Sequence, residues 1–264
     1  MGVKWIDVNV LSFKNMLLLE RVQLSWLPGW LREDELAIAL QANPVVTWYL
    51  KHKCPEISGW VDQVLAARAG TPLAEAGRVR EAEVAILNQI NDLLVYVIDP
   101  SIYDAQPFTQ WDSNELRSLT DWRGKTVIDI GSGTGRLALI AAEQARLVYA
   151  VEPVANLRGY IKDKARRSGF DHVYPVDGLI TELPFPDGFS DVTMGGHVFG
   201  DYPEAEYAEM ARVTRPGGML ILCPGSGIKE ETRHNFLVER GFEWAVFVEP
   251  PDDRVRKYWK RLPG

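Results

Sequence analysis

Residues 127–136 read VIDIGSGTGR and decide the fold of the chain. The run before the first glycine is apolar and rich in β-branched side chains, as in a buried strand, and a helical pattern follows the third glycine. Gly131 can turn sharply off the strand, Gly133 has no Cβ to keep a ligand from the backbone, and Gly135 lets the helix pack closely on the sheet. The stretch therefore predicts a strand, a glycine turn and a helix, with a ligand site at the carboxyl end of the strand.

The same alternation of strand and helix continues on the carboxyl side of this turn. Helices of this length between short strands indicate right-handed βαβ units and a mainly parallel sheet. The expected strands cover residues 126–130, 147–151, 172–175, 191–194 and 219–223, and the expected helices cover 136–144, 155–168 and 205–213. The family resemblance described below further implies a turn at residues 215–218 before the fifth strand and a last strand pair from about residue 241.

An acid follows the second expected strand. Glu152 lies about 20 residues beyond the glycine turn, where a carboxylate can accept hydrogen bonds from both ribose hydroxyls of a nucleoside. The turn has the spacing GxGxG and not the GxGxxG of dinucleotide-binding proteins, and Asp129 stands two residues before Gly131. A negative charge there would repel a pyrophosphate but suits the cationic methionine end of S-adenosylmethionine. Asp129 can also hold the backbone of the turn, and both roles can coexist.

At this point the chain resembles the class I S-adenosylmethionine-dependent methyltransferases, close to the small-molecule enzymes of the quinone-biosynthesis type. The resemblance covers residues 124–224 and rests on DIGSGTG at 129–135, VEP at 151–153, Asp177 with LPFPD at 183–187, and RVTRPGG at 212–218. It implies an α/β, Rossmann-like, doubly wound fold with a mainly parallel seven-stranded sheet. It also implies S-adenosylmethionine as cofactor, with S-adenosylhomocysteine as product.

The resemblance assigns most of the cofactor site. Asp177 is expected to accept a hydrogen bond from the adenine amino group, because a carboxylate only accepts and this amine only donates. It can also be an ordinary turn aspartate in Asp-Gly. The expected cofactor-binding residues are Asp129, Gly131, Ser132, Gly133, Thr134, Gly135, Glu152, Pro153, Asp177, Gly178, Leu179 and Gly195.

The methyl acceptor is expected beside the segment MGGH at 194–197. His197 is the candidate general base, because histidine titrates near neutral pH, although it can also be a packing residue. Candidate acceptor contacts are Tyr103, Trp111, His197 and Tyr202, with Asp201 a weaker one. No carboxylate cluster of the kind that a catechol-type magnesium site needs is evident, so no metal is expected.

The first 110 residues have a helical pattern and do not resemble the methyltransferase core. We expect residues 1–110 to form a helical cap or extension and 111–264 the cofactor-binding domain. One long helical run is expected over residues 73–97, after Thr71-Pro72, and another helix from Pro44. The extension holds Trp5, Trp26, Trp30, Trp48 and Trp60. These can line an acceptor pocket, fill a helical core, or, with residues 11–31, contact a membrane surface.

Composition narrows the class of partner. The chain of 264 residues is 46% hydrophobic and 25% charged, as in soluble globular proteins. Its net charge of −7 argues against nucleic-acid binding, which needs clustered Lys and Arg. No uncharged apolar run is long enough to span a membrane. Two distant cysteines, Cys54 and Cys223, suit a reduced, cytoplasmic setting, and either a monomer or a homodimer is expected.

The sequence thus predicts a methyltransferase that transfers a methyl group in line to an oxygen or carbon atom of a small molecule. Two alternatives stay open. One is a catalytically degenerate module that binds the cofactor or a partner protein. The other is a protein or RNA methyltransferase, which the acidic charge and the absence of an Asn-Pro-Pro-Tyr-like motif after residue 194 disfavour. An NAD-dependent oxidoreductase is the least favoured class.

Overall fold

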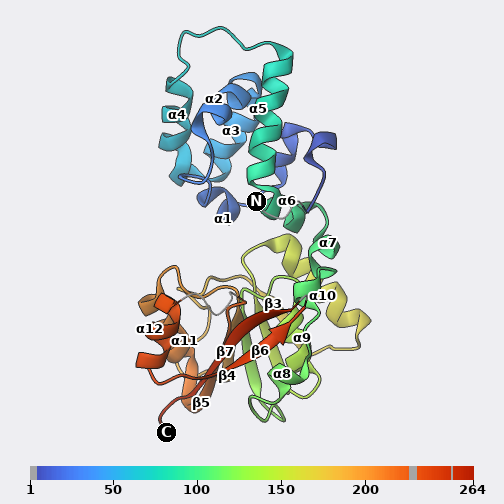
Figure 1. The fold of residues 1–264 in the computed structure, drawn as a ribbon, viewed down its shortest axis with the longest axis vertical. Coiled ribbons are helices and arrows are strands. Elements are labelled where there is room, and N and C mark those ends of the chain that lie inside the picture. The colour runs from blue at the N-terminus through green and yellow to red at the C-terminus, as the bar shows by residue number, and fades with distance from the viewer. Residues whose placement is uncertain (1–4, 226–230, 251) are drawn as a thin grey trace. The chain divides into compact units, whose positions relative to one another are not determined.

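The structure is a computed structural model that describes residues 5–225, 231–250 and 252–264. The chain divides into two compact units, Met1–Tyr103 and Asp104–Gly264 (Figure 1). The second unit begins before residue 111, where the sequence predicted the boundary. Asp104 belongs to the second unit because its carboxylate accepts hydrogen bonds from Lys164 (2.7 Å) and Tyr160 (3.0 Å).

The first unit is helical and has its own apolar core. That core includes Leu36, Leu40, Leu50, Ile86 and Leu94, all at most 1% exposed. The helices are α1 (Arg21–Ser25), α2 (Glu33–Ala42), α3 (Pro44–Lys53), α4 (Ser58–Ala66), α5 (Ala76–Gln89), α6 (Asn91–Ile98) and α7 (Pro100–Asp104), with 3-10 turns at Val8–Val10, Phe13–Leu18 and Pro55–Ile57. The predicted helix from Pro44 is confirmed.

The long helix predicted over residues 73–97 is wrong in two respects. The helix begins only at Ala76, so residues 71–75 lie outside it, and it breaks at Ile90 into α5 and α6.

Three of the five tryptophans of the first unit are exposed and fill no core: Trp26 (43%), Trp30 (49%) and Trp48 (61%). In the described residues no helix combines the length and apolarity needed to cross a membrane.

The second unit is built on one seven-stranded sheet with strand order β3-β2-β1-β4-β5-β7-β6. The strands are β1 (Thr126–Ile130), β2 (Leu147–Val151), β3 (Val173–Val176), β4 (Ser190–Gly196), β5 (Thr214–Cys223), β6 (Glu243–Glu249) and β7 (Asp253–Arg261). β1 to β5 pair in parallel, whereas β7 runs antiparallel to both of its neighbours. The predicted mainly parallel α/β fold is therefore confirmed.

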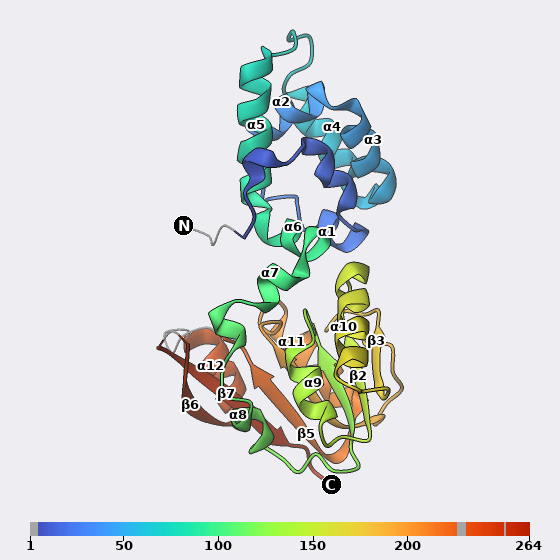
Figure 2. The ribbon, with the colours of Figure 1, turned by 90° about the vertical axis from the view of Figure 1, so that its right-hand side faces the viewer.

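Helices cover both faces of this sheet (Figure 2). One core joins it to α8 (Asn114–Arg117), α9 (Arg136–Ala142) and α10 (Ala155–Arg167), and the other joins it to α11 (Pro203–Val213) and α12 (Glu231–Glu239). A 3-10 turn at Pro107–Thr109 precedes α8. All five residues of β1 are buried, as expected for the central strand between two helical layers.

The predicted turn at residues 215–218 lies inside β5. This strand already pairs at Thr214 with Ser190, and the pairing resumes at Met219 with Val192. The four residues between form an irregularity in which Gly217 has φ +70°. The predicted turn is thus a β-bulge within β5, at the point where the chain passes from α11 into the sheet.

Candidate functional site

The glycine turn after β1 needs its glycines for different reasons. Gly131, Gly133 and Gly135 have φ of +59°, +54° and +83°, which side chains other than glycine rarely adopt. A Cβ on Gly131 would overlap Val198, and one on Gly135, the N-cap of α9, would lie 3.2 Å from Ile161. At Gly133 the nearest atom would be 4.0 Å away. Only the middle glycine leaves open space where a ligand can approach the backbone.

Asp129 holds this turn from inside the protein. Its carboxylate accepts a hydrogen bond from the Ala138 amide of α9 (3.0 Å), and its backbone oxygen accepts one from the Ser132 hydroxyl (2.8 Å). The side chain is buried, and this burial raises the pKa of Asp129 to about 7. The structure thus shows the turn-holding role that the sequence allowed, and it leaves the charge of Asp129 adjustable near neutral pH.

Glu152 connects the ends of β1 and β2. Its Oε2 accepts a hydrogen bond from the Gly133 amide (2.9 Å), and its Oε1 accepts one from the Val154 amide (2.9 Å). Both carboxylate oxygens therefore bind backbone amides of the chain, and an ionised carboxylate placed here can accept hydrogen bonds from a ligand's hydroxyl groups. Glu152 is 5% exposed, and the bonds fix it beside the open space at Gly133.

Asp177 follows β3 at the same edge of the sheet. Its side chain is 73% exposed and pairs with Arg158 of α10 at 3.1 Å. Gly178 is required by packing, because a Cβ there would lie 2.9 Å from both Val151 and Pro184. Leu179 beside it is 43% exposed and offers an apolar surface. An accessible carboxylate and an apolar side chain are the groups that an adenine ring needs.

Arg158 was missed by the sequence reasoning. Besides pairing with Asp177, its guanidinium donates a hydrogen bond to the backbone oxygen of Glu152 (2.7 Å). It therefore ties together the two acids that the sequence selected. The available signal was a single cation in the first turns of the helix that follows Glu152.

The end of β4 has an unusual backbone. His197 has φ +60°, although it is not a glycine, and its amide donates a hydrogen bond to the Cys223 backbone oxygen (3.1 Å). A Cβ at Gly225 would overlap the imidazole, so the ring lies directly against that glycine. Partial dehydration by the surrounding protein and the nearby charge of Arg233 lower the pKa of His197. The ring is therefore neutral at pH 7 and able to accept a proton.

The remaining predicted acceptor residues lie in different environments. Tyr202 is 69% exposed just before α11, and Asp201 precedes it. Tyr103 belongs to the first unit, where its ring packs against Trp5 and Tyr96. Trp111 belongs to the second unit and is only 6% exposed. Of these residues only Trp111 shares a described hollow with His197.

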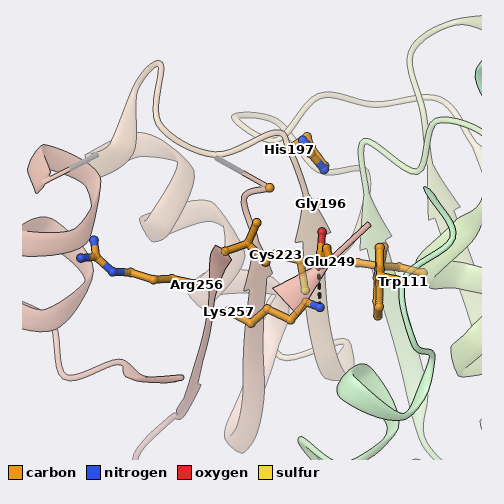
Figure 3. Close-up of a pocket in the computed structure, with 10 residues that line it drawn as sticks. Trp111, Gly196, His197, Cys223, Glu249, Arg256 and Lys257 are labelled. Atoms are coloured by element: carbon orange, nitrogen blue, oxygen red, sulfur yellow. Dashed lines mark ion pairs between the residues drawn. The ribbon is translucent and has the colours of Figure 1, made fainter. Parts of the chain in front are cut away.

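That hollow lies at the carboxyl ends of β4 and β5 and is open to solvent (Figure 3). Its walls include Trp111, Gly196, His197, Cys223, Glu249 and Lys257. Burial raises the pKa of Cys223 to about 12, so its thiol stays protonated. Glu249 and Lys257 were missed because they lie on β6 and β7, where the sequence carries no motif.

Comparisons with known proteins agree with this geometry. The methyltransferase domain family matches residues 128–222. An uncharacterized methyltransferase of Geobacillus sp. (strain WCH70) is 31% identical over 151 residues, which cover 56% of this chain and 68% of the relative. A demethylmenaquinone methyltransferase of Geobacillus kaustophilus (strain HTA426) is 28% identical over 126 residues, 46% of this chain and 54% of that enzyme. The chain therefore matches only about half the length of the latter.

The fold also matches a solved structure. A SAM-dependent methyltransferase from Aquifex aeolicus superposes with a TM-score of 0.50 at 19% identity, over 61% of this chain and 97% of that one. At this level of identity the likeness concerns the fold alone.

Proposed function

Because the chain belongs to the class I S-adenosylmethionine-dependent methyltransferases, we propose that it methylates an oxygen or carbon atom of a flat small molecule such as a phenol or quinol. The similarity to a demethylmenaquinone methyltransferase supports this acceptor class. The single observation that carries the proposal is the Gly133 amide bound to Glu152 beside open space, close to the end of β4.

The residues present fit S-adenosylmethionine. Glu152 is held beside the open space at Gly133, where its carboxylate can accept from the ribose hydroxyls, Asp177 is accessible to the adenine amino group, and Leu179 can cover the adenine ring. Asp129 lies behind the turn, where its charge can favour the cationic methionine end. When bound, the cofactor supplies an activated methyl group on a sulfonium.

The protein's own contribution is chiefly positioning. A methyl transfer needs the attacking atom in line with the breaking C–S bond at roughly 3 Å. The open space expected at Gly195 and Gly196 beside the sulfonium is not found, since a Cβ would lie 3.0 Å from Val198 at the first and 3.5 Å from Leu137 at the second. His197, neutral at pH 7, would accept the proton of an acceptor hydroxyl as the methyl group arrives.

The first test is calorimetric titration with S-adenosylmethionine, with NAD as the control ligand. Micromolar binding of S-adenosylmethionine and none of NAD is expected. Incubation with a panel of phenols and quinols, analysed by mass spectrometry, then identifies the acceptor by its added methyl group. Binding of the cofactor without methylation of any panel member would contradict the proposed acceptor class. Failure to bind the cofactor would overturn the proposal as a whole.

A further inference from the structure

The hollow beside His197 contains a buried ion cluster that the proposed mechanism does not use. Lys257 of β7 is 1% exposed and forms ion pairs with Glu249 of β6 (2.7 Å) and with Glu115 of α8. The rings of Trp111 and Phe247 face its ammonium group at 3.8 and 4.8 Å. Two carboxylates surround one ammonium, so the cluster of Lys257, Glu115 and Glu249 has a net charge of −1.

Arg256, the second cation that lines the hollow, does not pair with this cluster, whereas the charge of Arg136, whose guanidinium lies 5.1 Å from the centre of the Trp111 ring, acts on Glu249 from outside the hollow. Figure 3 shows the Arg256 side chain extending away from Lys257 and Glu249. Its guanidinium lies instead against the Trp244 ring (5.4 Å) and near Glu231 (3.6 Å). Residues on adjacent positions of a strand point to opposite faces of the sheet, which explains this separation. The lowered pKa of His197 means that the imidazole adds no charge at pH 7.

Glu249 has unused capacity to accept hydrogen bonds. Its side chain is 8% exposed and pairs with Lys257 at 2.7 Å, and the charge of Arg136 also acts on it. A buried carboxylate favours as many hydrogen-bond donors as it can obtain, because it has lost its water. Glu249 also lines the hollow itself. A ligand entering there would meet a carboxylate that can accept from it.

We propose that Glu249 accepts a hydrogen bond from a neutral hydroxyl group of the methyl acceptor, and that the same carboxylate disfavours acceptors that place a carboxylate or phosphate against it. The inference rests on the proposed function and defines its acceptor further. The hollow also reaches Gly196 and His197, so a hydroxyl-bearing ring in it lies next to the candidate base. Trp111 supplies an aromatic wall for such a ring.

A matched pair of probes tests the proposal through binding alone. The protein is loaded with S-adenosylhomocysteine, and 2-naphthol and 2-naphthoate are titrated at pH 7 by calorimetry. These probes share a ring system and differ in bearing a neutral hydroxyl or an anionic carboxylate. We expect 2-naphthol to bind about tenfold or more tightly than 2-naphthoate, since like charges placed together in an interface are strongly disfavoured.

The variant Glu249→Gln removes one charge of the cluster while keeping an acceptor oxygen and the side-chain size. We expect the preference for 2-naphthol to fall to about threefold or less, with gain of 2-naphthoate binding. Glu243→Gln at the exposed start of β6 is the control and should keep the full preference. Binding of S-adenosylhomocysteine and an unchanged melting temperature verify that each variant is folded.

The outcomes separate this inference from the proposed function. Without binding of S-adenosylhomocysteine, the proposed function itself fails. If the loaded wild-type protein binds both naphthalenes equally, or neither, the inference fails while the cofactor site stands. An undiminished preference in folded Glu249→Gln would also overturn it, because the discrimination would then come from elsewhere.

Discussion

The backbone amide of Gly133 donates a hydrogen bond of 2.9 Å to Oε2 of Glu152. The two residues stand at the ends of neighbouring parallel strands, β1 and β2, whose last residues, Ile130 and Val151, are paired. This bond holds the glycine turn and the Glu152 carboxylate next to each other. The open space at Gly133 and the carboxylate therefore belong to a single site, on which the following predictions rest.

Gly133→Val should abolish detectable binding of S-adenosylmethionine, because the new side chain fills the space beside the turn. The positive φ adds a stability cost of about 2 kcal/mol. Gly169→Val is the matched control, since Gly169 also has positive φ (+76°) with open space around it, but lies in the turn after α10. Calorimetry should show cofactor affinity lost in the first variant and kept in the second. Wild-type affinity in Gly133→Val would remove the turn from the binding site.

Asp177→Ala should weaken cofactor binding by about fivefold, which corresponds to loss of one hydrogen bond worth roughly 1 kcal/mol. Asp171→Ala is the control, because Asp171 is a fully exposed acid ahead of the same strand. The decisive comparison is adenosine with inosine as competitor, since inosine lacks the amino group. Wild-type protein should prefer adenosine, and the variant should not; an equal preference in both proteins would contradict the adenine role.

Binding of S-adenosylmethionine should become tighter as the pH rises from 6 to 8. The pKa of Asp129 is raised to about 7, so the side chain is mostly neutral at pH 6 and mostly ionised at pH 8. A cationic ligand prefers the ionised form. S-adenosylhomocysteine lacks the sulfonium charge and should show a smaller change, and Asp129→Asn should remove the difference between the two ligands. Parallel pH profiles of both ligands in the wild type would show that this charge does not act on the sulfonium.

His197→Asn should preserve cofactor binding and reduce turnover at least tenfold with a hydroxyl acceptor. Asparagine tolerates the left-handed backbone of this position (φ +60°), so the variant tests the imidazole and not the backbone. Since the pKa of His197 is lowered, wild-type activity should fall only below the ordinary histidine range of about 6.5. His52→Asn in the first unit serves as control. Unchanged turnover in His197→Asn would exclude histidine as the base.

Most of the sheet and the position of the glycine turn and its neighbouring acid could be predicted from the sequence, because their signals are local. A strand followed by GxGxG, and an acid at the end of the next strand, use only the strand period and the turn chemistry of glycine. The break in the long helical run was harder to predict, since it comes from tertiary packing around Ile90, which is fully buried. The helical spacing of apolar residues continues through Ile90, so this pattern alone does not reveal the break.

The acceptor side could not be predicted in the same way. Glu249 and Lys257 form their ion pair across β6 and β7, although the strand register places Asp253 opposite Glu249 and Ala245 opposite Lys257, and Glu115 lies 142 residues before Lys257. No local pattern encodes a contact of that separation. The sequence therefore singled out the candidate residues at the ends of the parallel strands and missed the ion cluster on the antiparallel pair.

The strand order has a consequence for how the chain acquires its fold. In the part of the chain that the structure describes, β6 pairs with β7 alone, and β7 lies between β6 and β5. During synthesis β6 leaves the ribosome with no strand to pair with until the last strand has followed. Domains form as they emerge, and unpaired strand edges invite association with other chains. The exposed β6 residues Trp244 and Val248 would be available to chaperones in that interval, and slow translation of residues 243–261 would prolong it.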